Sequence, residues 1–384
     1  MSAGLTIRPI HDARGRNSFL NLPFRLYRDD PHWVPPLRWA QAKVFAGRTA
    51  FFQRAEMALL LAERAGRAVG RIAAIHNRAH DAEHHDAVGF FGFFECEPAD
   101  TEAAAGLFEA AGRWLAERER TAMRGPVNPS MNAECGLLIE GFDRPPMVMM
   151  PYNPQKYIEL YESAGLAKCK DLYAYLVRAE SVDEGAKGRS RMLRMADIIK
   201  RKHPEVQVRT LDMKRYEAEV LRLVEVFESA RTSNWGHVPL TEAEALEMAR
   251  DMKAVIDPDL IVLAEVDGEP AGASMALPNI NRALAACKGR LFPFGFLRFL
   301  RAMRRIHEIR IFGIAALERY RHLGIAGLLM LETILRGRAK GIDTGEASWV
   351  LEDNVMSNRT LQNVLDPEHY KTYRIYEKPI PSFG

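Results

Sequence analysis

The sequence predicts an α/β (α+β) protein of two tandem domains, each with a mixed, mostly antiparallel twisted sheet flanked by helices. Three observations predict this class. The chain has 384 residues, more than one ordinary domain of roughly 100–200 residues holds. Segments of the first half recur in the second half in the same order. In each half a glycine-bearing strand precedes a helix, which is typical of a β–α–β crossover.

The elements are expected in the same order in both halves. A first strand is followed by polar helical segments, a two-stranded hairpin with a glycine-containing turn, the glycine-bearing strand, a helix, another strand and a tyrosine-rich strand. The clearest of these are first strands at 5–10 and 206–211, hairpins at 57–75 and 260–277, and helices at 101–118 and 324–340. We therefore predict domains at residues 1–178 and 206–384. The charged segment 179–205 between them is expected to be an exposed helix or tether with a solvated basic face.

The repeat is carried by matched short segments. "LAERAGRAVGRIAAIHN" starts at Leu61 and "LAEVDGEPAGASMALPN" starts at Leu263. Their shared leucine, alanine, glutamate, glycine and asparagine positions all differ by 202 (263 − 61). Trp33 and Trp235 keep the same offset and are each followed by Pro-Leu. Such agreement indicates a tandem duplication.

Two further matches have larger offsets. Gly92 in "FFGFF" and Gly313 in "IFGIA" differ by 221, so the second half gains a net 19 residues (221 − 202) before its fourth strand. The pattern Asn-x-x-x-Asn ends at Asn132 in the first half and at Asn358 in the second, an offset of 226.

Composition restricts the function class. The net charge is only +3, whereas nucleic-acid binders usually carry a strongly basic surface, so no nucleic-acid partner is expected. Cysteines at 96, 135, 169 and 287 form no CxxC pair and are interpreted as reduced thiols. The N-terminal segment lacks a signal-peptide apolar run, and no stretch of about 18 uncharged apolar residues occurs. These features predict a cytoplasmic protein without a spanning helix.

The segment "ERYRHLGIAGLLMLE", residues 318–332, has the chemistry of an anion-binding helix start. Backbone N–H groups and the helix dipole attract a pyrophosphate at a helix N-terminus. Gly324 permits close backbone approach, and Arg319, Arg321 and His322 add positive charge. A plain helix cap is the alternative interpretation of the same residues.

This loop and the element order resemble the GNAT superfamily of acyl-CoA-dependent N-acyltransferases. The superfamily's cofactor loop, Arg/Gln-x-x-Gly-x-Gly/Ala, matches Arg321-x-x-Gly324-x-Ala326. The resemblance implies acyl-CoA as co-substrate and no metal. The implied cofactor-binding residues are Ala315, Ala316, Leu317, Arg319, Arg321, His322, Leu323, Gly324, Ile325, Ala326 and Asn358.

The first half provides a comparison for this loop. At the offset of 221, Asp100, Ala103 and Ala105 stand where the second half has the arginine, glycine and alanine of the loop. This acidic run without a turn glycine would repel a pyrophosphate. Only the second half is therefore expected to bind acyl-CoA.

Acyl transfer to an amine needs a free amine, a polarised thioester carbonyl and a proton for the departing thiolate. The resemblance implies that a backbone N–H of residues 313–317 binds the carbonyl oxygen. The superfamily's tyrosine has a counterpart in the first half at Tyr161, which we interpret as a core residue, whereas the second half has Leu365. The catalytic candidates are Glu352 with its neighbour Asp353, Asn358, Tyr370 and Tyr373. A solvated strand end and strand packing are the alternatives for these residues.

Other titratable residues are open to two interpretations each. His237 is either a second base or an ordinary loop histidine, and the latter is favoured. His76, His80 and His84 are spaced by four but are interpreted as part of a solvated polar loop rather than as metal ligands. Glu95 is either a buried acid with a shifted pKa or the exposed end of its strand.

The inserted segment of the second half suggests an amphipathic acceptor. Residues 291–305 combine phenylalanines and leucines with Arg298, Arg301, Arg304 and Arg305. This pattern is typical of an interfacial membrane element or a hydrophobic lid, and packing against the first half is the alternative. Together with "FFGFFE" and "YKTYRIYEKP", it resembles a long bacterial branch of the superfamily that includes ceramide-synthase-type enzymes.

The expected function is acylation of a lipid amine, such as a sphingoid base, in the cytoplasm or at the inner membrane surface. Three alternatives remain. They are acetylation of a small amine or peptide by acetyl-CoA, a catalytically inactive tandem module that binds CoA or lipid, and a transferase that uses charged tRNA, against which the modest basicity argues. The sequence leaves the acyl length and the oligomeric state open.

Overall fold

The computed structural model describes residues 4–183, 187–232 and 234–381, and the chain forms two compact units. Unit 1 comprises Met1–Asp171, Ala283–Leu300 and Lys371–Gly384, and unit 2 comprises Leu172–Arg282 and Arg301–Tyr370. The units differ from the two sequence halves because two segments of the second half belong to unit 1 and residues 172–178 of the first half belong to unit 2.

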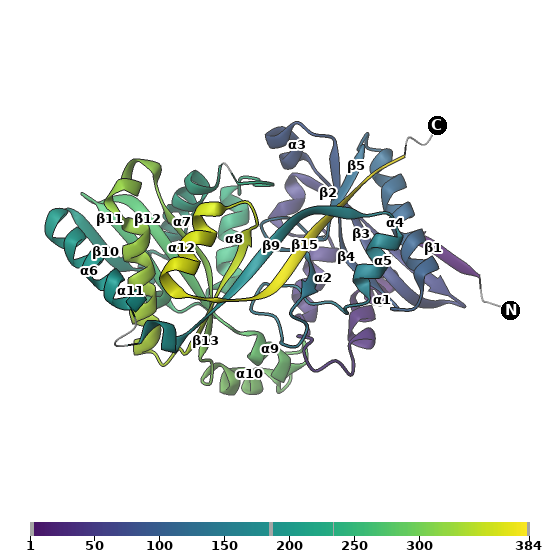
Figure 1. The fold of residues 1–384 in the computed structure, drawn as a ribbon. Coiled ribbons are helices and arrows are strands. Elements are labelled where there is room, and N and C mark those ends of the chain that lie inside the picture. Colours follow the sequence, from purple (N-terminus) through teal and green to yellow (C-terminus); the bar gives the residue numbers. More distant parts are fainter. Residues whose placement is uncertain (1–3, 184–186, 233, 382–384) are drawn as a thin grey trace. The chain divides into compact units, whose positions relative to one another are not determined.

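Unit 1 contains a mixed sheet with strand order β1-β2-β3-β4-β5-β15, and β8 also pairs with β15. Neighbouring strands are antiparallel apart from β4 and β5, which pair in parallel from Val88 to Phe90. The strands are β1 (Leu5–Pro9), β2 (Ala55–Arg64), β3 (Arg67–Asn77), β4 (Val88–Cys96), β5 (Ala122–Gly125), β8 (Leu137–Glu140) and the later part of β15 (Glu368–Pro379), with the small pair β6 (Val127–Asn128) and β7 (Glu134–Cys135). The helices are α1 (Ala13–Leu26), α2 (Arg38–Phe45), α3 (Arg78–His84), α4 (Thr101–Ala116) and α5 (Tyr157–Ser163) (Figure 1).

Unit 2 repeats this plan with strand order β9-β14-β13-β12-β11-β10. Its strands are the later part of β9 (Ala167–Arg178), β10 (Val206–Thr210), β11 (Ile261–Val266), β12 (Glu269–Pro278), β13 (Glu308–Ala316) and β14 (Thr344–Leu351). Its helices are α6 (Lys187–Lys202), α7 (Tyr216–Arg231), α8 (Glu242–Met252), α11 (Ile325–Ala339) and α12 (Val355–Leu365). The helices α9 (Asn281–Cys287) and α10 (Gly295–Met303) include residues of both units. The predicted fold class is therefore confirmed.

The repeat at offset 202 reflects the same local structure in both units. The register of β2 against β3 shifts between Ala62 and Glu63, and that of β11 against β12 shifts between Ala264 and Glu265. An arginine of the first strand pairs with this glutamate in each unit, at 2.9 Å and 2.6 Å. A β-bulge changes the twist of its strand, so the duplication preserved a detail of the hairpin geometry.

The offset of 221 also relates equivalent positions in the two sheets, whereas the offset of 226 does not. The parallel pairing of β4 with β5 ends at Phe90, and that of β13 with β14 ends at Ile311 (311 − 90 = 221). By contrast, Asn132 lies in the turn between β6 and β7, while Asn358 lies within α12. The match between these asparagines was wrong, because a short polar pattern recurs easily in unrelated loops and helices.

Each unit is completed by the strand that ends the other half of the sequence. Residues 172–178 of β9 pair with β14 in unit 2. Residues 372–379 of β15 pair with β5 and β8 in unit 1. The two halves of the chain therefore exchange their final strands.

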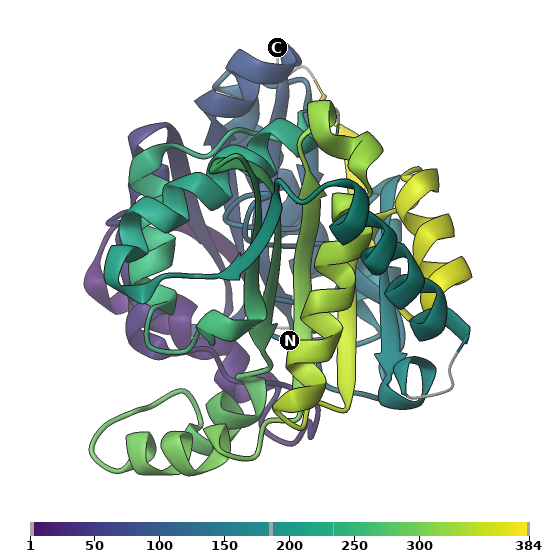
Figure 2. The same ribbon diagram turned by 90° about the vertical axis from the view of Figure 1, so that its left-hand side faces the viewer.

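The helix of the segment between the halves packs on unit 2 instead of forming a tether. Met192, Ala196 and Ile199 of α6 are buried against Leu328 and Leu331 of α11. Figure 2 shows α6, in dark teal, beside α11, in yellow-green. The basic residues of α6 lie mostly on its other side, and residues 184–186 of this segment lie outside the described residues.

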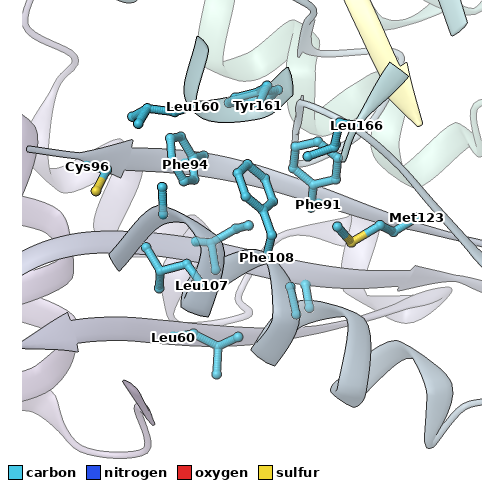
Figure 3. Packing of buried hydrophobic residues seen from close by; sticks show 14 of the residues in the cluster. Leu60, Phe91, Phe94, Cys96, Leu107, Phe108, Met123, Leu160, Tyr161 and Leu166 are labelled. Atoms are coloured by element: carbon cyan, nitrogen blue, oxygen red, sulfur yellow. The ribbon is translucent and has the colours of Figure 1, made fainter. Parts of the chain in front are cut away.

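The core of unit 1 is rich in aromatic rings. Phe94 stacks on Phe108 with centroids 4.7 Å apart, and Phe91 and Tyr161 pack edge-on against Phe108 or Phe94. Figure 3 shows these four side chains together, between α4, α5 and the sheet. Tyr161 is 1% exposed, so its interpretation as a core residue is confirmed. None of the helices in the described ranges combines the length and the apolar character needed to cross a bilayer.

Candidate active site

The middle of β13 is partly exposed although it is an inner strand of unit 2. Residues 311–314 are partly exposed, whereas the matching residues of β4 are buried. β13 pairs with β14 only from Glu308 to Ile311. Beyond Ile311, the edge of β13 that faced β14 has no ladder partner within the described chain. This edge offers backbone polar groups to a ligand.

The same position in unit 1 is filled by backbone. A Cβ atom added at Gly92 would lie 1.6 Å from the carbonyl oxygen of Val127 in β6. The next residue, Phe93, donates its N–H to the side chain of Asn128 at 2.6 Å. At Gly313 of unit 2, an added Cβ would instead meet the side chains of Phe227 and Arg231, at 2.9 and 3.0 Å. The duplicated glycine thus allows the backbone of β6 to approach closely in unit 1 and side chains of α7 to approach closely in unit 2.

The helix that follows β13 begins without a side-chain cap. Gly324 is the N-cap of α11, has φ 74° and ψ 19°, and has no side chain to accept from the first-turn N–H groups. A residue other than glycine would be strained in this left-handed conformation. In unit 1 the equivalent N-cap is Asp100, whose carboxylate accepts from Ala103 N at 3.0 Å. Arg64 donates to the same carboxylate at 2.7 and 2.9 Å and lowers its pKa.

The two N-caps correct the sequence alignment. They differ by 224 (324 − 100) rather than 221, so Asp100 corresponds to Gly324 and not to Arg321. The difference arises because a 3₁₀ turn, η5 (Glu318–Leu323), precedes α11. With the corrected alignment, unit 1 still has an acidic N-cap where unit 2 has a glycine.

The expected cofactor-binding residues divide into a buried and an exposed set. Ala315, Ala316, Leu317, Leu323 and Ile325 are buried, and several of them pack against β11 and β12. The exposed side chains are Arg319, Arg321, His322 and Ala326. The buried set therefore shapes the turn from β13 to α11, while the exposed set surrounds its N-terminus.

A buried polar network lies where β13 and β14 separate. Arg310 and Glu346 are register partners on these strands and approach to 3.9 Å. Arg310 donates to Ser348 Oγ at 2.9 Å and to its carbonyl oxygen at 3.1 Å. The Ser348 hydroxyl donates to one oxygen of Glu346, and the hydroxyl of Tyr370 donates to the other. Buried charges are costly unless they are paired, so such networks are candidates for function.

Of these four residues, only Tyr370 was predicted. A signal was available in the sequence, because Arg310 and Glu346 are charged residues within the strands β13 and β14. Parallel inner strands are usually buried on both faces.

The α7 face of the sheet adds a second charged group. The guanidinium of Arg231 lies 5.0 Å from the Phe227 ring centroid and 5.5 Å from that of Phe312. Burial lowers its pKa. Nearby, His237 is buried and its Nε2 lies 3.1 Å from a carboxylate oxygen of Glu228. His237 is therefore a buried, paired histidine and not a solvated one.

The other catalytic candidates lie elsewhere or have structural contacts. The Asn358 amide donates to the carbonyl oxygen of Leu351 at 3.0 Å and accepts from the Tyr175 hydroxyl at 2.8 Å. Glu352 is six residues beyond Glu346 (352 − 346), which corresponds to about 20 Å of extended chain. Tyr373 is fully buried and belongs to unit 1. Tyr370 alone among the four candidates joins the polar network of β13 and β14.

Glu95 is a mostly buried acid whose side chain is 12% exposed. It accepts hydrogen bonds from Tyr27 at 2.8 Å and Tyr157 at 3.0 Å, lies 3.7 Å from Arg71, and has a pKa raised by burial. The interpretation of the histidine-rich segment as a solvated loop was wrong, since His80 is 1% exposed on α3 and bonds to Asp86 at 2.8 Å. No group of three or more His, Cys, Asp or Glu side chains suited to a metal ion occurs among the residues that the structure describes.

The chain is similar over nearly its whole length to two bacterial proteins. It is 37% identical over 389 aligned positions to a "Bacterial ceramide synthase" of Caulobacter vibrioides, covering 99% of this chain and 98% of the relative. It is 32% identical to "Protein YghO" of Escherichia coli, with 97% and 95% covered. No protein-family profile matches the chain.

Solved structures show the same fold at low sequence identity. A tandem GNAT protein from the clavulanic acid biosynthesis pathway superposes with a TM-score of 0.58 at 12% identity, covering 98% of this chain and 99% of the other. A GCN5-related N-acetyltransferase of Sphaerobacter thermophilus has a TM-score of 0.51 at 14% identity, with 98% and 96% covered.

Proposed function

Because the chain belongs to the GNAT superfamily of N-acyltransferases, in the family of the Caulobacter vibrioides ceramide synthase, we propose that it transfers an acyl group from acyl-CoA to an amphipathic primary amine of the sphingoid-base type. One observation carries the proposal. The helix after β13 begins at the uncapped Gly324 beside an unpaired strand edge, whereas Asp100 and β6 fill both places in unit 1.

Unit 2 is the acyl-CoA-binding unit in this proposal. The N–H groups of the first turn of α11 and the helix dipole favour an anion. The exposed side chains of Arg319, Arg321 and His322 add positive charge around it. In unit 1 the Asp100 carboxylate already takes the place of such an anion, because it bonds to a first-turn N–H and to Arg64. The first half of the sequence is then a degenerate copy.

Tyr370 and Glu346 are proposed to move the proton of the reaction. The amine nitrogen forms a bond to the thioester carbon, the carbon–sulfur bond breaks, and one proton passes from nitrogen to sulfur. Tyr370 is partly exposed and donates to the buried Glu346. It can accept the amine proton as its own proton moves to Glu346, and return a proton to the thiolate. Ser348 and Arg310 fix the orientation of the carboxylate.

Exposed phenylalanines around α10 support an amphipathic acceptor. Phe292 is 81% exposed and Phe294 is 70% exposed, and Leu297 and Leu300 are also exposed. Arg298 and its neighbouring arginines provide positive charge beside them. Apolar and basic side chains in one short helix favour the interface of an anionic membrane, where long-chain amines partition. Peripheral membrane contact through residues 291–305 is part of the proposal.

The test is acyl transfer by the purified protein. Long-chain acyl-CoA and acetyl-CoA are each incubated with a sphingoid amine, a small amine and a peptide amine, and the release of free CoA thiol is followed. Release from long-chain acyl-CoA with the sphingoid amine is the expected result. Release from acetyl-CoA with small amines or peptides alone would contradict the proposed acceptor, and CoA binding without release from any pair would indicate an inactive module.

A further inference from the structure

Helix α6 borders the start of α11, the helix proposed to bind the acyl-CoA pyrophosphate. A Cβ atom added at Gly324 would lie 3.1 Å from Cδ1 of Ile199, and one added at Gly327 would overlap Cε of Met195. The numbering falls along α6 as it rises along α11, so the two helices run antiparallel (Figure 2). The C-terminal turn of α6 therefore lies beside the N-terminal turn of α11.

These contacts show which side of α6 each of its last residues occupies. On one side of the helix pair, Lys200 lies 3.8 Å from Glu332 of α11. Met195 covers Gly327 on the other side. Residues three and four apart share one side of an α-helix, so Ile198 and Lys202 follow Met195 along this second side. Both side chains are exposed.

The last turn of α6 carries the consecutive cations Lys200, Arg201 and Lys202. Lys200 has its partner on α11, and Arg201 donates to the carbonyl oxygen of Asp197 at 3.4 Å. Lys202 makes no hydrogen bond or ion pair within the described ranges. Basic residues at a helix C-terminus are generally favoured by the helix dipole. That effect applies to all three cations, whereas only Lys202 lies on the Met195 side.

Lys202 and Ile198 together form a surface suited to a phosphorylated nucleoside. The Lys202 backbone lies about 4.5 Å along the axis beyond Ile199, and helix side chains lean back towards the N-terminus of their helix. The Lys202 ammonium therefore reaches towards the level of Gly324. Ile198 is 44% exposed one turn earlier. A cation attracts a phosphate, and an aliphatic side chain offers a packing surface to a base.

We propose that Lys202 binds the 3′-phosphate on the adenosine ribose of acyl-CoA, and that Ile198 packs against the adenine. This inference rests on the proposed acyl-CoA-binding role of unit 2 and extends the site to a helix outside the cofactor loop. The pyrophosphate binds at the first turn of α11, and the 3′-phosphate, which lies one ribose away, binds at the last turn of α6. CoA is then bound more tightly than 3′-dephospho-CoA.

Titration calorimetry of the full-length protein with CoA and with 3′-dephospho-CoA tests the inference. The wild type should bind CoA about five- to tenfold more tightly than 3′-dephospho-CoA. Lys202→Gln should weaken CoA binding about fivefold and change the affinity for 3′-dephospho-CoA less than about twofold. Ile198→Ser should weaken both ligands by the same factor, because both contain adenine. High salt should reduce the preference of the wild type, since exposed charges are screened.

Arg201→Gln is the matched control, because it removes one positive charge from the same turn but on a different side. It should leave both affinities unchanged. Equal effects of Arg201→Gln and Lys202→Gln, or a wild type that does not prefer CoA, would overturn the inference and leave the acyltransferase function intact. A Lys202→Gln protein that keeps the preference but sediments less with anionic vesicles would assign α6 to lipid headgroups instead. A wild type that binds neither ligand would overturn the proposed function itself.

Discussion

Transplanting the N-cap of unit 1 into unit 2 should weaken acyl-CoA binding about 30-fold without unfolding the protein. In Gly324→Asp a carboxylate stands where Asp100 stands in α4. At about 4 Å from a bound phosphate, with an effective dielectric constant of about 20, the repulsion is about 4 kcal/mol. Partial exposure of this helix start reduces it to about 2 kcal/mol, which weakens binding about 30-fold. The charge of an aspartate at a helix N-terminus contributes up to about 1 kcal/mol, which offsets a cost of about 1 kcal/mol for the left-handed conformation at φ 74°.

Titration calorimetry with CoA and a thermal unfolding scan measure the two effects separately. The dissociation constant should rise about 30-fold, while the melting temperature moves by no more than a few degrees, because the two stability contributions nearly cancel. Gly324→Asn is the matched control, since it has the same size and capping ability but no charge. If Asn weakens CoA binding as much as Asp does, or if Asp leaves the affinity unchanged, the electrostatic reasoning about this helix start is wrong.

Three further predictions follow from the geometry. Tyr370→Phe and Glu346→Gln should each lower kcat about 100-fold without changing acyl-CoA affinity. In rapid-quench or thiol-release assays, kcat of the double variant should be no lower than that of either single variant. If the two reductions in kcat multiply instead, the two residues do not share a proton path. Asp100→Ala should reduce the free energy of unfolding by about 1 kcal/mol at neutral pH. The pKa of Asp100 is lowered from 3.8, chiefly by Arg64, so its contribution to stability is present above pH 3.8 and is lost as the pH falls through the folded pKa. Urea titrations should therefore show that the unfolding free energies of the wild type and the variant converge at low pH. A difference that stays constant with pH would contradict the assignment. Phe294→Ser with Leu297→Ser should reduce sedimentation with anionic vesicles several-fold and leave thermal stability unchanged, whereas unaltered sedimentation would remove the membrane role of α10.

Much of the fold was predictable because equivalent residues of the two copies keep equivalent structural surroundings. The positions related by the offset of 202 carry the same bulge in both hairpins, and those related by the offset of 221 end the parallel pairing in both sheets. Glycines such as Gly92 and Gly313 are informative because a close neighbour excludes any side chain there. The start of α11 was placed correctly relative to Gly324, although its match to unit 1 was three residues off. A 3₁₀ turn has no hydrophobic periodicity that would reveal it.

The candidate site was only partly predictable. The helix-start residues followed a motif, but Arg310, Glu346 and Ser348 did not, because charged residues in a strand are ordinarily assigned to its exposed face. Their burial depends on the β14 register against β13 and on Tyr370, which arrives from a later strand. The exchange of β9 and β15 was not predictable either. Alternation of apolar and polar residues specifies which face of a strand is buried, but it does not specify which strand lies beside it.

That exchange ties the completion of unit 1 to residues that are synthesised after all of unit 2. Its sheet includes β15, whose pairing residues 372–379 follow unit 2 in the chain, so the sheet of unit 1 cannot be completed until unit 2 has been synthesised. Unit 2 meanwhile takes β9 from the first half. Each half of the sequence supplies the closing strand of the other half's sheet, and a truncation just before β15 would damage the unit that is farthest upstream. Separating the two halves would remove from each sheet the strand that the other half supplies, and each half would keep only the strand that it now contributes to its neighbour.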